Sequence, residues 1–349
     1  MATAPNRAQA RLFAELIAEF EPRIHRAFMA SVTDLHAGVD WSALLSALQA
    51  GDMESAILAL NISEAAFAEY SSQMTAAYAK SGASTAAQIQ QLGYGAIGTR
   101  FNQSNPRAQE WIRSNIALRV TEFTEEQVRN ARMVIGTGYA AGQGPRQIGL
   151  DLVGRVQSGK RVGGIMGLDG PRAERLHNVT IGMRTPEGVR HLVIKHNDGT
   201  LGMRYQVNKA TAQRITRAYN AGTEVPAADR LISETQYRNA LLQARATTVA
   251  STETASAVMG ARQEEWIQLA ESQGLDEKAI KKTWRHRRGA EKQFRADHLA
   301  LSGQSVMGLR TPFIMGDGTQ MQHAHDPRGG AKQVVGCGCD TEFVLVRGV

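Results

Sequence analysis

Both cysteines of this 349-residue chain lie in one Cys-x-Cys motif, at residues 337–339 near the end of the sequence. The same C-terminal segment contains a basic run around Trp284, an Arg-Ala-Asp-His sequence at 295–298, and a glycine-rich stretch with His323 and His325. Two cysteines separated by a single residue would close a strained disulfide ring, so we predict reduced thiols. The chemistry open to this segment is therefore a metal site, a redox pair or buried thiols.

Most of the remaining chain has helical periodicity. Leu12, Leu16, Phe20, Ile24 and Phe28 recur every four residues, and comparable patterns continue to about residue 130. The length allows two or three domains with a core of their own. We predict a mainly α protein with a small α+β C-terminal domain, beginning with a helical domain at residues 1–130.

The middle region, residues 131–272, is also predicted to be helical. A capping box at 124–127 predicts a helix start near Thr124, and Asp169 is expected to cap a helix before Pro171. Apolar stretches on both sides of the turn at 197–199 predict one β-hairpin near residues 190–207. Short strands are expected in residues 284–349, within a C-terminal domain at 273–349.

Several catalytic and nucleotide-binding motifs are incomplete in this sequence. The G-x-G-x-x-G sequence at 93–98 follows a helical pattern, and the glycine loop at 154–160 continues with Arg161 where a phosphate-binding loop has Ser or Thr. The hydrolase motifs G-x-S-x-G and H-E-x-x-H are absent. Glu253 lies in an apolar helical pattern, where a buried hydrogen bond or an ion pair with arginine is expected. We therefore predict that the chain is not an enzyme.

The cysteine motif is a candidate metal site. Thiolate and imidazole groups bind zinc, and a structural zinc site uses four of them. Cys337 and Cys339 could supply two ligands and His298 a third. For the fourth we favour His325, with His323 or Asp326 as further options. Buried thiols beside a hydrogen-bonded structural histidine are the alternative interpretation.

The C-terminal segment is also basic. From residue 281 to the end there are eleven Lys/Arg against six Asp/Glu, so an excess of five positive charges out of a total of +7 lies there. Such a run favours contact with phosphates or with an acidic protein surface, although a solvated helix face has the same composition. The candidate nucleic-acid-binding residues are Lys281, Lys282, Arg285, Arg287, Arg288, Lys292 and Arg295. The chain has no run of about 18 apolar residues, so we expect no membrane partner.

Residues 130–349 resemble the phage Mu F-like minor head proteins, also called head morphogenesis proteins of tailed phages. The residues that carry the resemblance occur in a fixed order: Thr252-Glu253, Trp284, Arg295 to His298, Gly303, Phe313, Asp326-Pro327 and Cys337-Gly338-Cys339. The stretches at 161–168 and 221–229 are similar to the middle region of this family. The N-terminal helices resemble it only loosely.

Two departures from the family pattern affect what can be carried over. The sequence at 284–288 is strongly basic where the family often has an acidic residue, which argues against an acidic role for that strand. Gly336 and Gly338 replace the usual Asn and Arg around the cysteines. The terminal turn is thus expected to depend on the backbone freedom of glycine.

The resemblance implies a minor capsid protein present in few copies, which binds the portal protein and acts in head assembly and in genome packaging or ejection. It implies a place in the virion, in the capsid interior or at the portal vertex, after assembly in the host cytoplasm. Other capsid proteins and packaged DNA, bound without sequence specificity, are further expected partners. The alternatives are a DNA-binding internal virion protein and, less favoured, a metal-dependent enzyme.

Overall fold

The computed structural model describes residues 4–94, 100–287, 289 and 293–346. The chain forms two compact units, each built from separated stretches. Unit 1 comprises Met1–Phe28, Ala68–Val120 and Thr247–Val349, and unit 2 comprises Met29–Phe67 and Thr121–Ala246. The boundaries predicted after residues 130 and 272 do not coincide with these units. The reason is that the long helices α1 (Ala4–Ala37), α6 (Leu118–Ala140) and α11 (Ala227–Gln273) each contribute residues to both.

Helices and small sheets make up the two units, as the sequence predicts. Helix accounts for 65% and strand for 10% of the structure, so the expected mainly α class with a small strand-containing C-terminal region is confirmed. Within the described residues, no helix has both the length and the apolar character needed to span a membrane.

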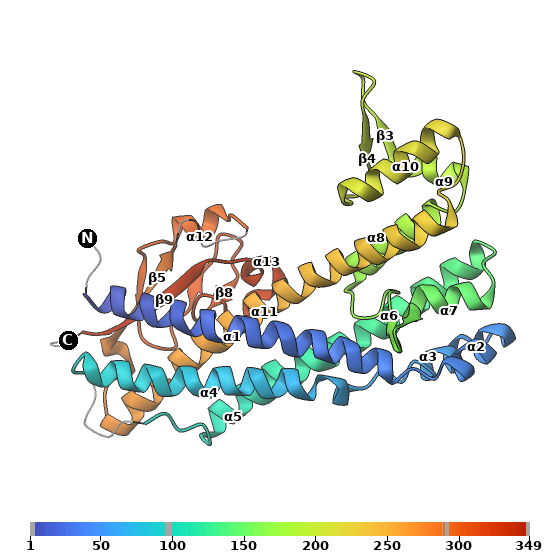
Figure 1. Cartoon of the computed structure of the whole chain (residues 1–349). Coiled ribbons are helices and arrows are strands. Elements are labelled where there is room, and N and C mark those ends of the chain that lie inside the picture. The colour runs from blue at the N-terminus through green and yellow to red at the C-terminus, as the bar shows by residue number, and fades with distance from the viewer. Residues whose placement is uncertain (1–3, 95–99, 288, 290–292, 347–349) are drawn as a thin grey trace. The chain divides into compact units, whose positions relative to one another are not determined.

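The helical part of unit 1 is organised around the second half of α11. Residues 252–267 of this helix are all buried, and small residues allow neighbouring helices to approach closely. Trp111 of α5 (Pro106–Ile112) lies against Gly260 of this helix. A Cβ on Gly260 would lie 2.7 Å from the Trp111 indole nitrogen, which is too close for a larger residue. The Trp111 ring stacks on Tyr78 of α4 (Ala68–Gln91), with ring centroids 4.4 Å apart. Figure 1 shows α1 and α4 side by side, and Gln88 of α4 donates to the carbonyl of Ala8.

The C-terminal part of unit 1 is a small α+β module formed by residues 277–346, hereafter the C-terminal module. Its three-stranded antiparallel sheet has the order β6-β5-β9, and β7 pairs with β8 in a separate hairpin (Figure 1). The strands are β5 (Ile280–His286), β6 (Ser305–Met307), β7 (Phe313–Ile314), β8 (Gln320–Met321) and β9 (Cys339–Leu345). The helices are α12 (Ala296–Ala300) and α13 (Gly330–Val334), with 3-10 turns at Glu277–Ala279 and Pro327–Gly329.

The C-terminal module has its own apolar core. Trp284 of β5 is fully buried, and its ring meets Phe313 and His298 edge-on, at 5.4 and 5.2 Å between centroids. Cys339 belongs to the same core. A second cluster joins Phe343 of β9 to Trp266 of α11, whose rings stack with centroids 6.1 Å apart. The module therefore packs on α11 and also encloses the cysteine motif.

Unit 2 consists of short helices that follow capping signals in the sequence. They are α2 (Trp41–Ala50), α3 (Met53–Leu58), a 3-10 turn (Glu64–Phe67), α7 (Pro145–Val153), α8 (Gly170–Gly182), α9 (Pro186–Leu192) and α10 (Lys209–Ala221), together with parts of the long helices. Asp169 caps α8 by accepting from the backbone N–H of Arg172, as predicted. The start predicted near Thr124 is wrong, because Thr124 lies inside α6 and donates its hydroxyl to the carbonyl of Thr121.

Unit 2 contains two β-hairpins. The predicted one is formed by β3 (Val193–Lys195) and β4 (Leu201–Met203), and it is shorter than expected because α9 occupies the residues up to Leu192. The other, β1 (Arg155–Gln157) with β2 (Lys160–Val162), lies in the glycine-rich stretch that begins at Gly154, where the sequence predicts no strand. Gly154 precedes β1 with φ of 72°, and a Cβ there would lie 1.9 Å from the carbonyl oxygen of Val162. Only glycine fits that position.

Candidate metal centre

The structure brings His298 together with both cysteines, although they are about 40 positions apart in the sequence. The ligand atoms of His298, Cys337 and Cys339 all lie within 4.8 Å of one another, and among the described residues they form a group that could hold a metal ion. His298 Nδ1 is 3.4 Å from Cys337 Sγ and 3.6 Å from Cys339 Sγ. His298 and Cys339 are buried, and Cys337 is partly exposed.

Three different elements supply these side chains. His298 lies in α12, and Cys339 is the first residue of β9. Cys337 lies in the turn between α13 and β9, where Gly336 has φ of 68°. The backbone N–H of Cys339 donates to Cys337 Sγ at 3.3 Å, so the turn directs the first sulfur back toward the second cysteine.

A hydrogen-bond network orients the His298 ring. Nε2 of His298 lies 2.8 Å from Oε1 of Gln333. The amide nitrogen of Gln333 donates to the carboxylates of Asp297 and Asp317, at 3.3 and 3.1 Å, so its oxygen must face the histidine. Nε2 of His298 therefore carries a proton and donates it, which leaves Nδ1 directed at the two sulfur atoms. This is the arrangement of a metal-binding histidine whose second nitrogen is held by a polar partner.

The two thiols differ in their affinity for protons. The pKa of Cys337 is well below its usual range, because the side chain of Cys339 donates a hydrogen bond to its sulfur and His298 adds to the effect. The pKa of Cys339 is raised, because its proton is held in that hydrogen bond and its surroundings are apolar. Burial lowers the pKa of His298, but its hydrogen bonds with Cys337 and Gln333 and the nearby charges of Cys337 and Asp297 together more than offset this, and the net shift is upward. The hydrogen bonds of the group thus favour one thiolate beside an imidazole, as a metal ligand set requires.

His325, the predicted fourth ligand, is engaged elsewhere. Its Nε2 donates to the backbone carbonyl of Cys339 at 2.9 Å, and its ring stacks on Phe13 with centroids 6.1 Å apart. His323 is buried with Nδ1 bonded to the carbonyl of Ala324, and burial lowers its pKa to about 4. Asp326 binds Arg328 and accepts from the backbone of Gln322. The sequence suggests three residues as the fourth ligand. None of them belongs to the group that His298 forms with the two cysteines.

His286 is the residue that the sequence analysis missed. It ends β5 directly opposite Cys339 in the β5–β9 register, and its Nδ1 is 3.5 Å from Cys339 Sγ. The side chain is half-buried at the edge of the group. The alternation of β5 could have indicated it, since His286 and the core residue Trp284 are two positions apart and thus face the same side of the strand.

The basic residues of β5 are used inside the module. Lys282 is fully buried, and its ammonium group donates to the carbonyls of Leu309 and Gln322 at 2.9 and 2.8 Å. Burial lowers the pKa of Lys282 to about 7. Lys281 is half-buried and takes part in the backbone pairing of β5 with β6 and β9. Lys282 therefore does not take part in an exposed phosphate-binding surface.

The arginines of the basic run bind acceptors within the module. Arg285 pairs with Glu342, and Arg287 pairs with Asp340 at 2.6 Å. Arg295 donates to the backbone carbonyls of Lys332 and Val335, at 2.7 and 2.6 Å. Arg288 and Lys292 lie outside the described residues. Among the described members of the predicted nucleic-acid-binding set, Lys282, Arg285, Arg287 and Arg295 therefore make contacts inside the module.

The expectation for Glu253 is confirmed. Its carboxylate lies 3.0 Å from Nε of Arg119, and both residues belong to unit 1. Glu253 thus takes part in an ion pair that joins α11 to α6.

Comparisons with known proteins provide no assignment for this chain. No protein-family model, no curated protein and no solved structure matches it. Two features of the chain remain from which a function can be proposed. They are the geometry of the candidate metal centre and the residues that carry the resemblance to the Mu F-like proteins.

Proposed function

We propose that the C-terminal module is an interaction module closed by a structural zinc ion. His298, Cys337 and Cys339 supply three ligands, and His286 supplies the fourth. The observation that carries this proposal is the convergence of one imidazole nitrogen on two sulfurs at 3.4 and 3.6 Å.

These separations are close to those of a tetrahedral zinc site. With bonds of about 2.3 Å to sulfur and about 2.0 Å to nitrogen, tetrahedral angles put the sulfur and nitrogen atoms about 3.5 Å apart. The distance from His286 Nδ1 to Cys339 Sγ, 3.5 Å, agrees with the same value. His286 lies outside the group whose ligand atoms are all within 4.8 Å of one another, so its ring has to turn toward His298 and Cys337 to complete the site. Two thiolates and two imidazoles form a set that suits zinc better than magnesium or calcium, which prefer oxygen ligands.

A structural role follows from where the ligands lie in the module. They connect the end of β5, α12 and the start of β9, and Cys339 is part of the module's core. A bound ion would cross-link these three elements in a module that is too small to bury a large core. Four protein ligands would leave no open position for a substrate.

Zinc content provides the first test. The full chain, purified under reducing conditions, is expected to contain one zinc per molecule by elemental analysis. The double variant C337S/C339S should lose the metal, whereas His191→Ala, which changes an exposed histidine of unit 2, should retain it. Absence of stoichiometric metal from the native protein, or its retention in the double variant, would refute the zinc site.

We further propose that the protein is a minor head protein of a tailed phage, which binds the portal protein and acts in head assembly and genome packaging or ejection. Support comes from the residues that resemble the Mu F-like proteins, because Trp284, His298, Phe313 and Cys339 pack together in the C-terminal module. A position in the capsid interior or at the portal vertex belongs to the same proposal.

Complex formation tests this second proposal. The full chain, co-expressed with the portal protein of the same genome, is expected to elute with it as one peak in size-exclusion chromatography. If the module makes the contact, C337S/C339S should weaken the complex. Separate elution of the two native proteins at micromolar concentration would contradict portal binding and would leave the zinc site unaffected.

A further inference from the structure

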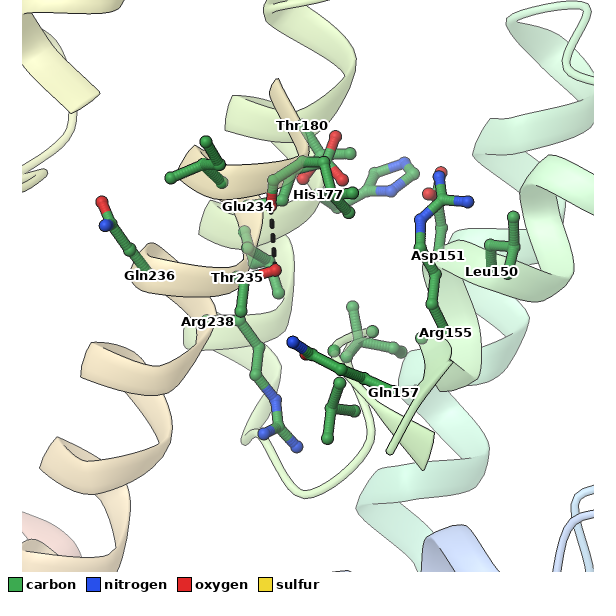
Figure 2. Close-up of a pocket in the computed structure, with 18 of the residues that line it drawn as sticks. Leu150, Asp151, Arg155, Gln157, His177, Thr180, Glu234, Thr235, Gln236 and Arg238 are labelled. Atoms are coloured by element: carbon green, nitrogen blue, oxygen red, sulfur yellow. Dashed lines mark hydrogen bonds between the residues drawn. The ribbon is translucent and has the colours of Figure 1, made fainter. Parts of the chain in front are cut away.

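Unit 2 contains a cavity of about 530 Å³ that is separate from the candidate metal centre. Its walls are formed by α7, the β1–β2 hairpin, α8 and the first part of α11. Figure 2 shows Glu234, Thr235 and Arg238 on α11, with Arg155 and Gln157 of β1 on the opposite wall. The volume is within the range of small-molecule sites.

Arg238 is a buried cation in the wall of this cavity. It is 7% exposed, and its guanidinium donates to His36 Nε2 at 3.1 Å and to the carbonyl of Met166 at 3.2 Å. Both acceptors are neutral, since burial and the charge of Arg238 lower the pKa of His36 to about 3. The Nε of Arg238 is buried with no hydrogen-bond partner among the described residues. Burial lowers the pKa of Arg238 to about 10, so the group stays charged at neutral pH.

The neighbouring hairpin carries two more guanidinium groups, of which only that of Arg155 belongs to the cavity lining. Arg155 lines the cavity, and Arg161 donates to the carbonyl of Gly154 and stacks on Trp41, with its guanidinium carbon 4.7 Å from the ring centroid. In the described part of the chain, neither these two arginines nor Arg238 has a carboxylate within ion-pair distance. Of the three, only Arg238 is buried. A buried charge without a counter-ion is costly, and an anionic ligand at Arg238 would remove that cost.

The acidic residues of the cavity do not cancel this positive charge. Asp151 is neutralised by Arg184, which donates to both of its oxygens at 2.9 and 2.7 Å. Burial raises the pKa of Glu234 to about 7. The charged groups that act on Glu234 are Asp151, Arg184, Arg155 and Arg230. Glu234 therefore takes up a proton more readily than an ordinary glutamate, and in its protonated form it can donate a hydrogen bond to an anion.

Apolar side chains surround the polar groups. Val156, Leu231 and Ile232 line the cavity and are 65%, 43% and 42% exposed. Exposed aliphatic side chains grouped at a cavity indicate a binding surface for an apolar body.

We propose that this cavity binds a small organic monocarboxylate with an apolar body. The carboxylate lies between Arg238 on α11 and Arg155 and Gln157 on the opposite wall, and the apolar body covers Val156, Leu231 and Ile232. A planar guanidinium suits a carboxylate because it offers parallel N–H donors. This site is independent of the proposed zinc ion and of portal binding.

Octanoate, octanol and octylammonium provide a matched test, because they differ only in the head group. Titration calorimetry on the full chain should give a dissociation constant below about 1 mM for octanoate, and affinities at least tenfold weaker for the other two. Equal binding of octanol or octylammonium, or the absence of octanoate binding at millimolar concentration, would overturn the proposal.

Two variants test the residues. R155Q and R238Q should each weaken octanoate binding about tenfold, whereas Arg190→Gln, at an exposed position of α9 paired with Glu187, should not change it. Arg155 is exposed, so R155Q should fold even if R238Q does not. If R155Q and folded R238Q both bind octanoate as tightly as the native protein does, the assignment of the carboxylate to Arg155 and Arg238 is wrong.

The carboxylate could come from a free small molecule or from the end of a polypeptide. An N-acetylated trileucine with a free carboxyl group and its C-terminal amide separate these sources. Octanoate binding at least as tight as that of the free-acid peptide supports the small molecule. Tighter binding of the peptide acid, with loss of binding by the amide, would overturn the small-molecule assignment in favour of a chain terminus.

Discussion

His286 lies opposite Cys339 in the antiparallel pair of β5 and β9, and its Nδ1 is 3.5 Å from the sulfur of that cysteine. Backbone pairing therefore places a second imidazole beside the ligand atoms that His298 and the Cys-x-Cys motif supply. His325 is closer to the cysteines in sequence, but its Nε2 binds the backbone carbonyl of Cys339.

Replacing His286 should change the metal site more than replacing His325. We expect His286→Ala to lower zinc affinity at least about tenfold, because three protein ligands and a water replace four protein ligands. Cobalt substituted for zinc reports the geometry, since its visible absorption is strong in tetrahedral sites and weakens when water raises the coordination number. His325→Ala should keep the tetrahedral spectrum. An altered spectrum in His325→Ala and an unaltered one in His286→Ala would assign the fourth ligand to His325.

Gln333 should affect metal binding without contacting the metal. Its oxygen accepts from His298 Nε2, and its amide group is held by Asp297 and Asp317. Gln333→Leu removes the acceptor that fixes the ring, so we expect zinc affinity to fall about 10–100-fold, as measured by competition with a chromogenic chelator. Gln304→Ala is the matched control, because Gln304 in the same module is exposed and its side chain donates to the carbonyl of Ala300. Equal affinities for the two variants would show that Gln333 does not orient His298.

Arg287 should contribute to stability more than to DNA binding. Its partner Asp340 is 1% exposed, so Arg287→Gln leaves a buried carboxylate without its ion pair. We expect a loss of about 2 kcal/mol in the free energy of unfolding, less than for a fully buried pair because Arg287 is partly exposed. Arg310→Gln, which breaks exposed pairs in the same unit, should cost under about 1 kcal/mol. Urea denaturation measures both. A large loss of DNA affinity in Arg287→Gln with unchanged stability would support the DNA-binding alternative instead.

Glu265 should make stability depend on pH. It is fully buried in α11, and both of its carboxylate oxygens lack a hydrogen-bond partner among the described residues. Burial raises its pKa from an ordinary value of 4.5 to about 8. Between these two values the folded chain retains a proton that the unfolded chain has lost, so the free energy of unfolding falls as pH rises through this window.

Glu265→Gln should remove that dependence. We expect the variant to be more stable than the native protein by about 1–3 kcal/mol at pH 8.5, with a much smaller difference at pH 5. Glu15→Gln, which changes an exposed carboxylate paired with Arg11, serves as the control. Urea titrations at both pH values give the comparison. The same stability difference for Glu265→Gln at pH 5 and pH 8.5 would exclude Glu265 as the titrating group.

The sequence was sufficient where a local signal determines the structure. Helical periodicity predicted α1, and the Asp169 cap predicted α8, because both depend on residues within a few positions of each other. The three-residue strands β1 and β2 have no alternating pattern of their own. Their pairing depends on Gly154, whose close approach to Val162 becomes visible only after the chain has folded.

By itself the sequence determined the helical class and the identity of three candidate metal ligands, His298, Cys337 and Cys339. The donor chemistry of thiols and imidazoles is a property of the residues and needs no coordinates. Only the tertiary structure decided that His286 lies beside Cys339 and that Lys282, Arg285, Arg287 and Arg295 of the basic run make contacts inside the module. Those outcomes depend on the β5–β9 register and on burial, which are set by contacts between residues that are far apart in the sequence.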